Sequence, residues 1–236
     1  QPIFSPKGRL LGHVGIGNRK DIRNAVEAAH AARSWAKTTA YNRAQVLYFI
    51  AENLSARHSE FAQRLKDLTG KPGAAEVEAS IQRLFTYAAW ADKYDGLVHH
   101  TPFRNVTLAM PEPIGVVGAV LPWNFPAQMY AWKVAPALVC GNSVIVKPSE
   151  LTSLSAYRMT QLAHQAGVPA GALILVTGTG EEVGEPLGRH KDVDIVSFTG
   201  STEVGRLFLK YSAESNLKEV VLECGGKSPQ VVFEDA

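Results

Sequence analysis

Five short segments of the sequence combine glycine or proline with side chains that can bind or react, and each follows an apolar run of strand length. They span residues 122–126, 147–150, 178–180, 198–201 and 223–226. In parallel α/β sheets, ligands bind where the strands end. Turn formation alone would explain any one segment. Five together, with Trp, Asn, Lys and Glu among them, predict a shared functional site.

Lys147 and Glu150 place a cation and a carboxylate three residues apart at the end of a predicted strand. A carboxylate beside a ribose can accept hydrogen bonds from both hydroxyl groups, as in dinucleotide-binding folds. It would also repel a 2′-phosphate, so Glu150 favours NAD over NADP, while Lys147 softens that preference. The alternative is a surface ion pair or a carboxylate at a helix start, either of which has little energetic value.

The segment from Phe198 to Gly205 is the candidate phosphate loop. Gly200 allows the backbone to approach a ligand, and Ser201 begins a predicted helix whose N-terminal amides attract anions. The alternative is an ordinary Ser N-cap after a glycine turn. The spacing matches neither G-x-G-x-x-G nor a Walker loop, because Arg206 stands where the Walker lysine would be. A dinucleotide therefore remains possible and a P-loop NTPase does not.

Glu223 and Asn124 are the candidate catalytic residues. Glu223 lies between a predicted buried strand and two glycines, where desolvation would raise its pKa and make it a competent general base. Asn124, between two aromatic residues, offers an amide N–H to a developing oxyanion. Structural caps and ion pairs explain each of them equally well in isolation.

The elements that must position these residues fall into two parts. Up to residue 100 the apolar spacing predicts helices: one with Asp21 as N-cap, then 42–55, one ending at Gly70, and 74–94. Further on, strands at 106–110, 115–121, 143–147, 173–177, 194–198, 219–222 and 230–233 are separated by helices that begin near 126, at 153, after 180 and at 202. Strands without polar alternation between helices indicate a parallel sheet covered on both faces. We expect an α/β fold with a doubly wound, Rossmann-like sheet.

Composition narrows the class of protein. The 236 residues are 46% hydrophobic and 19% charged with a net charge of +2, which excludes wholesale disorder and disfavours nucleic acid or a membrane as partner. Two cysteines and no zinc-type spacing predict a reducing, cytoplasmic setting without a metal site. The missing initiator Met and the abrupt end at Ala236 suggest a piece of a longer protein.

The motifs PWNFP at 122–126, KPSE at 147–150, FTGSTEVG at 198–205 and ECGGKSP at 223–229 resemble, in order and spacing, those of the NAD(P)-dependent aldehyde dehydrogenase superfamily. This resemblance implies oxidation of an aldehyde to a carboxylic acid with NAD as cofactor and NADP as the less favoured alternative. It implies a helical part at 1–100, a protruding oligomerisation hairpin at 101–114 and a Rossmann-like NAD-binding domain at 115–236. The protein would form homo-oligomers or pair with a partner module of its own chain.

By the same resemblance, Asn124 is the oxyanion-hole amide and Glu223 the base for the deacylating water. The residues expected around the cofactor are Val120, Leu121, Pro122, Trp123, Lys147, Glu150, Gly180, Gly184, Phe198, Gly200, Ser201, Val204 and Cys224. Lys147 and Glu150 would contact the adenine ribose and Ser201 the pyrophosphate.

Two departures from the family pattern matter. Cys224 replaces the usual Leu, and the chain ends before the position of the family's nucleophilic Cys, so we expect the catalytic Cys domain to be absent. Cys224 is a poor substitute because neighbouring strand residues point to opposite faces, and Cys140 is most simply a packing residue. Residues 91–113 resemble the truncated second module of two-module family 16 enzymes. The alternatives are a fragment of a full enzyme, a non-catalytic scaffold module and, least favoured, another Rossmann-type binder.

Overall fold

The computed structural model describes residues 1–226 and 228–236, so Lys227 of the last corner motif lies outside the described residues. Five parallel strands form one sheet in the order β7-β6-β5-β8-β9. Their bounds are β5 Val116–Val120, β6 Ser143–Lys147, β7 Leu173–Leu175, β8 Ile195–Gly200 and β9 Glu219–Cys224. The predicted α/β class and doubly wound parallel sheet are confirmed.

Alternation along the central strand β5 builds two separate cores. Val117 and Ala119 belong to the cluster under one helical layer, whereas Val116 and Val120 belong to the cluster under the other. Helices α6 (Pro126–Val139) and α7 (Ser153–Gln165) cover the first face, with α3 (Ala40–Ala56) and α5 (Ala74–Trp90) packed outside them. Helices α1 (Arg19–Ala31), α8 (Glu185–Arg189) and α9 (Thr202–Ala213) cover the second face.

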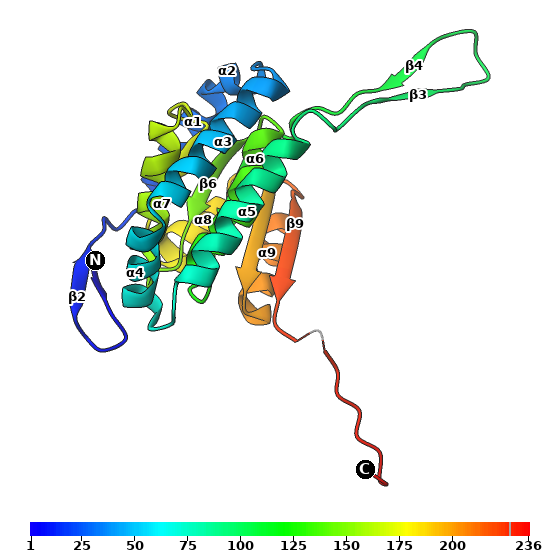
Figure 1. The fold of residues 1–236 in the computed structure, drawn as a ribbon. Helices are drawn as coiled ribbons and strands as arrows, with labels where there is room; N and C mark the ends of the chain where they lie inside the picture. The colour runs from blue at the N-terminus through cyan, green and yellow to red at the C-terminus, as the bar shows by residue number, and fades with distance from the viewer. Residues whose placement is uncertain (227) are drawn as a thin grey trace.

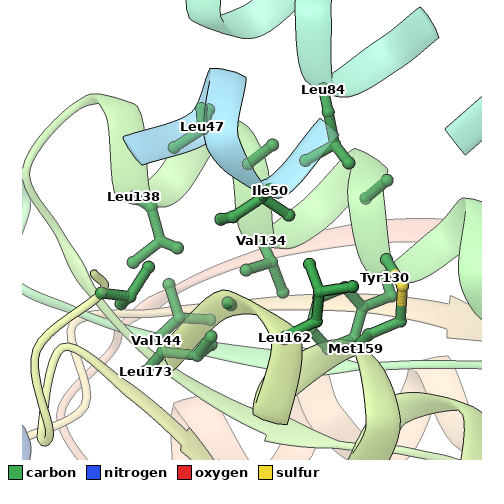
Figure 2. Packing of buried hydrophobic residues seen from close by; sticks show 14 of the residues in the cluster. Leu47, Ile50, Leu84, Tyr130, Val134, Leu138, Val144, Met159, Leu162 and Leu173 are labelled. Atoms are coloured by element: carbon green, nitrogen blue, oxygen red, sulfur yellow. The ribbon is translucent and has the colours of Figure 1, made fainter. Parts of the chain in front are cut away.

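Side chains from several elements meet in the first core, which Figure 2 shows at close range. Leu47 and Ile50 from α3 and Leu84 from α5 pack toward Val134 and Leu138 of α6. These side chains are no more than 4% exposed, and burying each contributes about 1.5–3 kcal/mol relative to leaving it in water. The N-terminal helices are therefore part of the same packed body as the sheet.

The helix boundaries differ from the sequence expectations in small ways. Asn18, not Asp21, is the N-cap of α1, and Asp21 occupies the third helical position and completes a capping box. Helix α4 (His58–Thr69) ends at Gly70 in the left-handed conformation (φ 74°), as the sequence predicts. Helix α5 ends at Trp90 rather than Tyr94. A short helix α2 (Arg33–Ala36) follows α1.

Two antiparallel pairs lie outside the main sheet. Strands β1 (Pro2–Phe4) and β2 (Leu10–His13) form one pair, and β3 (Leu97–His99) and β4 (Thr107–Ala109) form the other. The β3–β4 hairpin projects away from the rest of the molecule (Figure 1). The sequence predicts β4 but misses β3, so the paired strands begin at Leu97, before the expected boundary at 101.

The predicted strand at 230–233 is wrong. Val231, Val232 and Phe233 are 71–73% exposed, and the described residues after Gly226 contain no strand. An apolar run becomes a strand only when another backbone completes its hydrogen-bond ladder. The tail leaves β9 at the edge of the sheet and runs into solvent (Figure 1). No helix formed by residues 1–226 or 228–236 has the length and hydrophobicity needed to cross a membrane.

Candidate functional site

A pocket of about 1080 Å³ opens at the carboxyl ends of the strands. The chain runs from β5 outward through β6 to β7 and then returns to β8 on the other side of β5. This reversal leaves a crevice between the ends of β5 and β8, which is where open α/β sheets bind ligands. The volume slightly exceeds the usual range for small-molecule pockets, about 300–1,000 Å³.

All fifteen residues named from the sequence line this one pocket. They are Val120, Leu121, Pro122, Trp123, Asn124, Lys147, Glu150, Gly180, Gly184, Phe198, Gly200, Ser201, Val204, Glu223 and Cys224. They come from the ends of β5, β6, β8 and β9, from the loops after β5 and β6, from the segment after β7 and from the start of α9. The sheet thus brings together corners that are up to 104 positions apart, as a doubly wound topology requires.

Lys147 and Glu150 form an ion pair on the pocket wall. The Nζ of Lys147 lies 2.5 Å from Oε1 of Glu150, and the side chains are 6% and 31% exposed. The pair is therefore mostly withdrawn from water, unlike the exposed pairs that contribute little. Glu150 still contributes to the pocket lining, so its carboxylate remains within reach of a ligand.

The N-terminus of α9 forms another part of the wall. The hydroxyl of Ser201, the N-cap residue, accepts a hydrogen bond of 3.3 Å from the backbone N–H of Val204. Ser201 is therefore an N-cap, which is the structural alternative that the sequence left open. The start of α9 nevertheless lines the pocket, so its other N-terminal amides are available to a ligand. Gly200 is needed here because a Cβ would come within 2.5 Å of the Phe198 ring.

Helix α9 also supplies apolar lining that sequence reasoning missed. Leu207, Phe208 and Tyr211 follow the predicted Val204 at helical spacing, and the rings of Phe198 and Phe208 lie 5.1 Å apart. The i, i+3, i+4, i+7 spacing was the signal that could have identified them. Two further lining residues, Glu181 and Glu185, lie outside the predicted segments, whereas Ser149, Thr179, Thr199 and Gly225 lie inside them but were given no separate role.

Asn124 lies in the loop between β5 and α6. It is half-buried, and it lines the pocket beside Trp123. Lys71 places its ammonium group 6.0 Å from the Trp123 ring centroid and 5.9 Å from that of Phe125. The two aromatic residues around Asn124 therefore contact a cation from the α4–α5 connection.

Glu223 and Cys224 lie at the end of β9. Burial alternates along this edge strand, with Glu223 exposed and Cys224 half-buried, so the two side chains occupy opposite faces as expected. Cys224 packs against the second core. The expected desolvation of Glu223 is not observed, because β9 has a neighbouring strand on one side only.

Lys133 is a half-buried titratable residue that sequence reasoning missed and that interacts electrostatically with Glu223. It is the one charged residue of α6, and its Nζ donates a hydrogen bond of 2.8 Å to Oγ of Ser197. Burial lowers the pKa of Lys133 to about 8, and the Glu223 carboxylate opposes that shift. A lysine alone in an apolar helix was the signal that could have found it.

Cys140, expected to be a packing residue, is instead exposed at the C-cap of α6. Although the residue is exposed, neighbouring protein atoms partly desolvate its thiol and raise the pKa, and the guanidinium of Arg43 opposes the shift. Within the described part of the chain, no group of three or more His, Cys, Asp or Glu side chains is arranged to hold a metal ion.

Comparison with known proteins gives a consistent result. A sequence model described as "Aldehyde dehydrogenase family" matches residues 2–236. An aminoacetaldehyde dehydrogenase of Pseudomonas aeruginosa is 49% identical over 97% of this chain and 47% of its own length. A mitochondrial benzaldehyde dehydrogenase of Antirrhinum majus is 45% identical over 100% of this chain and 46% of its own length.

Solved structures share the fold. An aldehyde dehydrogenase of Pseudomonas aeruginosa superposes with a TM-score of 0.93 and 38% identity, over 97% of this chain and 48% of that one. A betaine aldehyde dehydrogenase of Staphylococcus aureus in complex with NAD⁺ superposes with a TM-score of 0.94 and 34% identity, over 100% of this chain and 48% of that one. The chain spans about half the length of the relatives that it matches.

Proposed function

This chain belongs to the aldehyde dehydrogenase family, and on that premise we propose that it is the NAD-binding portion of an enzyme that oxidises an aldehyde to a carboxylic acid. One observation carries the proposal: all fifteen residues singled out in the sequence line one pocket at the switch point of the sheet. NAD fits that pocket by the chemistry of its walls. They offer a carboxylate, a helix N-terminus and an apolar surface to a ribose, a pyrophosphate and an adenine respectively.

In this proposal each wall has a separate task. Glu150, oriented by Lys147, accepts hydrogen bonds from the ribose hydroxyl groups and disfavours a 2′-phosphate. Ser201 and the first amides of α9 hold the pyrophosphate. Val204, beside Gly180 and Gly184, lines the adenine pocket. When bound, NAD⁺ would accept the hydride that the aldehyde carbon gives up.

Asn124 and Glu223 are the two catalytic residues that this chain supplies. The Asn124 amide donates a hydrogen bond to the oxyanion that forms when a nucleophile adds to the aldehyde carbonyl. Glu223 then accepts a proton from the water that releases the acid. The ammonium group of Lys133 and the Glu223 carboxylate attract each other, which favours the charged form of Glu223. The nucleophile itself belongs to a Cys-bearing part outside these residues.

Three unequal parts divide the chain in this proposal, as expected from the sequence. The helices of 1–100 pack on the cofactor domain of 115–236, and the segment between them, with the β3–β4 hairpin, projects as an oligomerisation element. Val98, Leu108 and Met110 of this region are 56–76% exposed, so pairing with a second copy would remove apolar surface from water. Light scattering should detect a dimer, and Leu108→Asp should yield monomer. A monomeric wild-type chain would contradict this assignment.

The narrower resemblance to two-module enzymes stays a prediction. A purely structural scaffold module is not favoured, because a scaffold has no need of a pocket that keeps the full set of cofactor-type residues.

Isothermal titration of the chain with NAD⁺ tests the function directly. A Cβ at Gly180, on the pocket wall, meets no atom within 4 Å, so Gly180→Trp should fill the pocket without disturbing the fold. Gly15 also has open space around its Cβ but lies outside the pocket, so Gly15→Trp is the matched control. We expect NAD⁺ binding by the wild type and Gly15→Trp and its loss in Gly180→Trp. Equal binding by all three chains would place the cofactor elsewhere.

A further inference from the structure

The first turn of α5 reaches across to the start of α6. Oε1 of Glu76 accepts hydrogen bonds from the backbone N–H groups of Ala127 at 2.8 Å and Gln128 at 3.2 Å. Glu76 is half-buried and 51 residues away from Ala127 in the sequence. Its carboxylate therefore makes a long-range contact with the helix that begins two residues after Asn124.

Helix α6 needs such a partner because it lacks a local cap. Its N-cap residue is Phe125, whose side chain makes no capping hydrogen bond, and Pro126 at the first helical position has no N–H. The next two amides belong to Ala127 and Gln128, and these are the groups that an N-cap Ser or Asp would satisfy. A negative charge at this end also interacts favourably with the helix dipole. Glu76, which belongs to α5, thus caps the N-terminus of α6 in place of a local N-cap side chain.

The neighbouring Lys71 acts on the same loop from the same side. Its ammonium group lies about equally far from the Trp123 and Phe125 rings, which flank Asn124. It is also the charged side chain that lowers the pKa of Glu76, whereas burial, the larger effect, raises it. The α4–α5 connection and the first turn of α5 therefore contact the 122–128 segment through a carboxylate and a cation.

We propose that Glu76 is a positioning residue for Asn124: by capping α6 from α5 it fixes the end of the loop that carries the oxyanion-hole amide. The catalytic meaning of this role rests on the function proposed above, whereas the capping itself does not. Losing the carboxylate should release the start of α6 and let the Asn124 side chain sample other positions.

Hydrogen exchange of single amides in the ¹⁵N-labelled chain tests the capping. Glu76→Ala should speed exchange at Ala127 and Gln128 by about tenfold, since it removes hydrogen bonds to a charged acceptor. Glu76→Gln keeps an acceptor oxygen and should restore part of the protection. Glu78 lies on the same helix, is exposed and accepts from Gln82 only within α5, so Glu78→Ala is the control. Amides of β5 and β6 should be unaffected in every variant.

The Asn124 side-chain amide signal, assigned with Asn124→Ser, gives the second readout. It should shift in Glu76→Ala, return toward its wild-type position in Glu76→Gln and stay unchanged in Glu78→Ala. Unchanged protection at Ala127 in Glu76→Ala, or an equal loss of protection throughout the sheet, would overturn the proposal. If Glu76→Ala does not fold, Glu76→Asp, which withdraws the carboxylate by one methylene, carries the same test. Failure of the wild type to bind NAD⁺ would overturn the proposed function and leave this result standing.

Discussion

Lys133 Nζ donates a hydrogen bond of 2.8 Å to Ser197 Oγ and so joins the helix that follows Asn124 to the strand that leads to Ser201. This contact holds a lysine where burial lowers its pKa from 10.5 to about 8, against the opposing influence of the Glu223 carboxylate. The charged form is therefore less favourable in the folded chain than in the unfolded one. Lys133 thus links α6 to β8, and the energetic cost of burying its charge depends on pH.

The first prediction concerns stability against pH. Between pH 8 and 10.5 the unfolded chain keeps the Lys133 proton that the folded chain has lost, so folding becomes more favourable as pH rises through this window. Relative to Lys133→Met, the wild-type free energy of unfolding should rise by up to about 1 kcal/mol per pH unit there. Well below pH 8, where the folded and the unfolded chain both keep this proton, the two curves should run parallel. Urea titrations at several pH values measure the difference, and curves that stay parallel up to pH 10.5 would contradict the prediction.

Glu223→Gln provides the internal control for this interpretation. It removes the carboxylate that raises the pKa of Lys133, so the pKa of this lysine should fall below the wild-type value. NMR of the lysine side-chain carbons during a pH titration follows it directly. An unchanged Lys133 pKa in this variant would show that the two groups do not interact.

The second prediction concerns the choice of cofactor. Because Glu150 is held on the pocket wall by Lys147, the wild type should bind NAD⁺ at least about tenfold more tightly than NADP⁺. Glu150→Gln removes the charge that binds the ribose hydroxyl groups and repels a 2′-phosphate. The variant should therefore bind NAD⁺ more weakly and show a smaller preference for NAD⁺ over NADP⁺. Isothermal titration with both dinucleotides measures this, with Glu52→Gln on the exposed face of α3 as the matched control. Equal or tighter binding of NADP⁺ by the wild type would remove the role given to Glu150.

The third prediction concerns packing beneath the pocket. A Cβ added to the buried Gly205 of α9 would lie 2.9 Å from Sγ of Cys224. Gly205→Ala should therefore lower the free energy of unfolding by about 1 kcal/mol, since overpacking outweighs the better helix propensity of Ala. In a Cys224→Ala background the same change should be stabilising, because the sulfur is gone. Chemical denaturation of the wild type, the two single variants and the double variant completes this double-mutant cycle. A change of the same sign in the free energy of unfolding in both backgrounds would contradict the prediction.

These contacts show where sequence reasoning succeeds and where it stops. The strands and corners around Val120, Lys147 and Gly200 follow from local apolar patterns, and one rule of sheet topology brings them to a single edge. Lys133 and Glu76 act through partners 64 and 51 residues away, which no local pattern encodes. The segment 230–233 fails for the same reason, because β-structure depends on a partner strand as well as on composition.

The last prediction concerns catalysis by the 236-residue chain itself. A hydride leaves the aldehyde carbon only after a nucleophile has made that carbon tetrahedral, which requires a thiolate close to Asn124. Cys224 lies on the opposite face of β9 from Glu223 and packs against the second core, so Glu223 is badly placed to deprotonate it. Losing a nucleophile lowers the catalytic rate by about six orders of magnitude in a well-studied hydrolase.

Aldehyde-dependent NADH formation by the wild-type chain, followed by absorbance with acetaldehyde and benzaldehyde, should therefore not exceed that of the Cys224→Ser variant. Adding a Cys-bearing part should be needed for turnover. Activity that vanishes in Cys224→Ser and persists in Cys140→Ser would instead make Cys224 the nucleophile, and would show that β9 rearranges to turn its thiol toward Asn124.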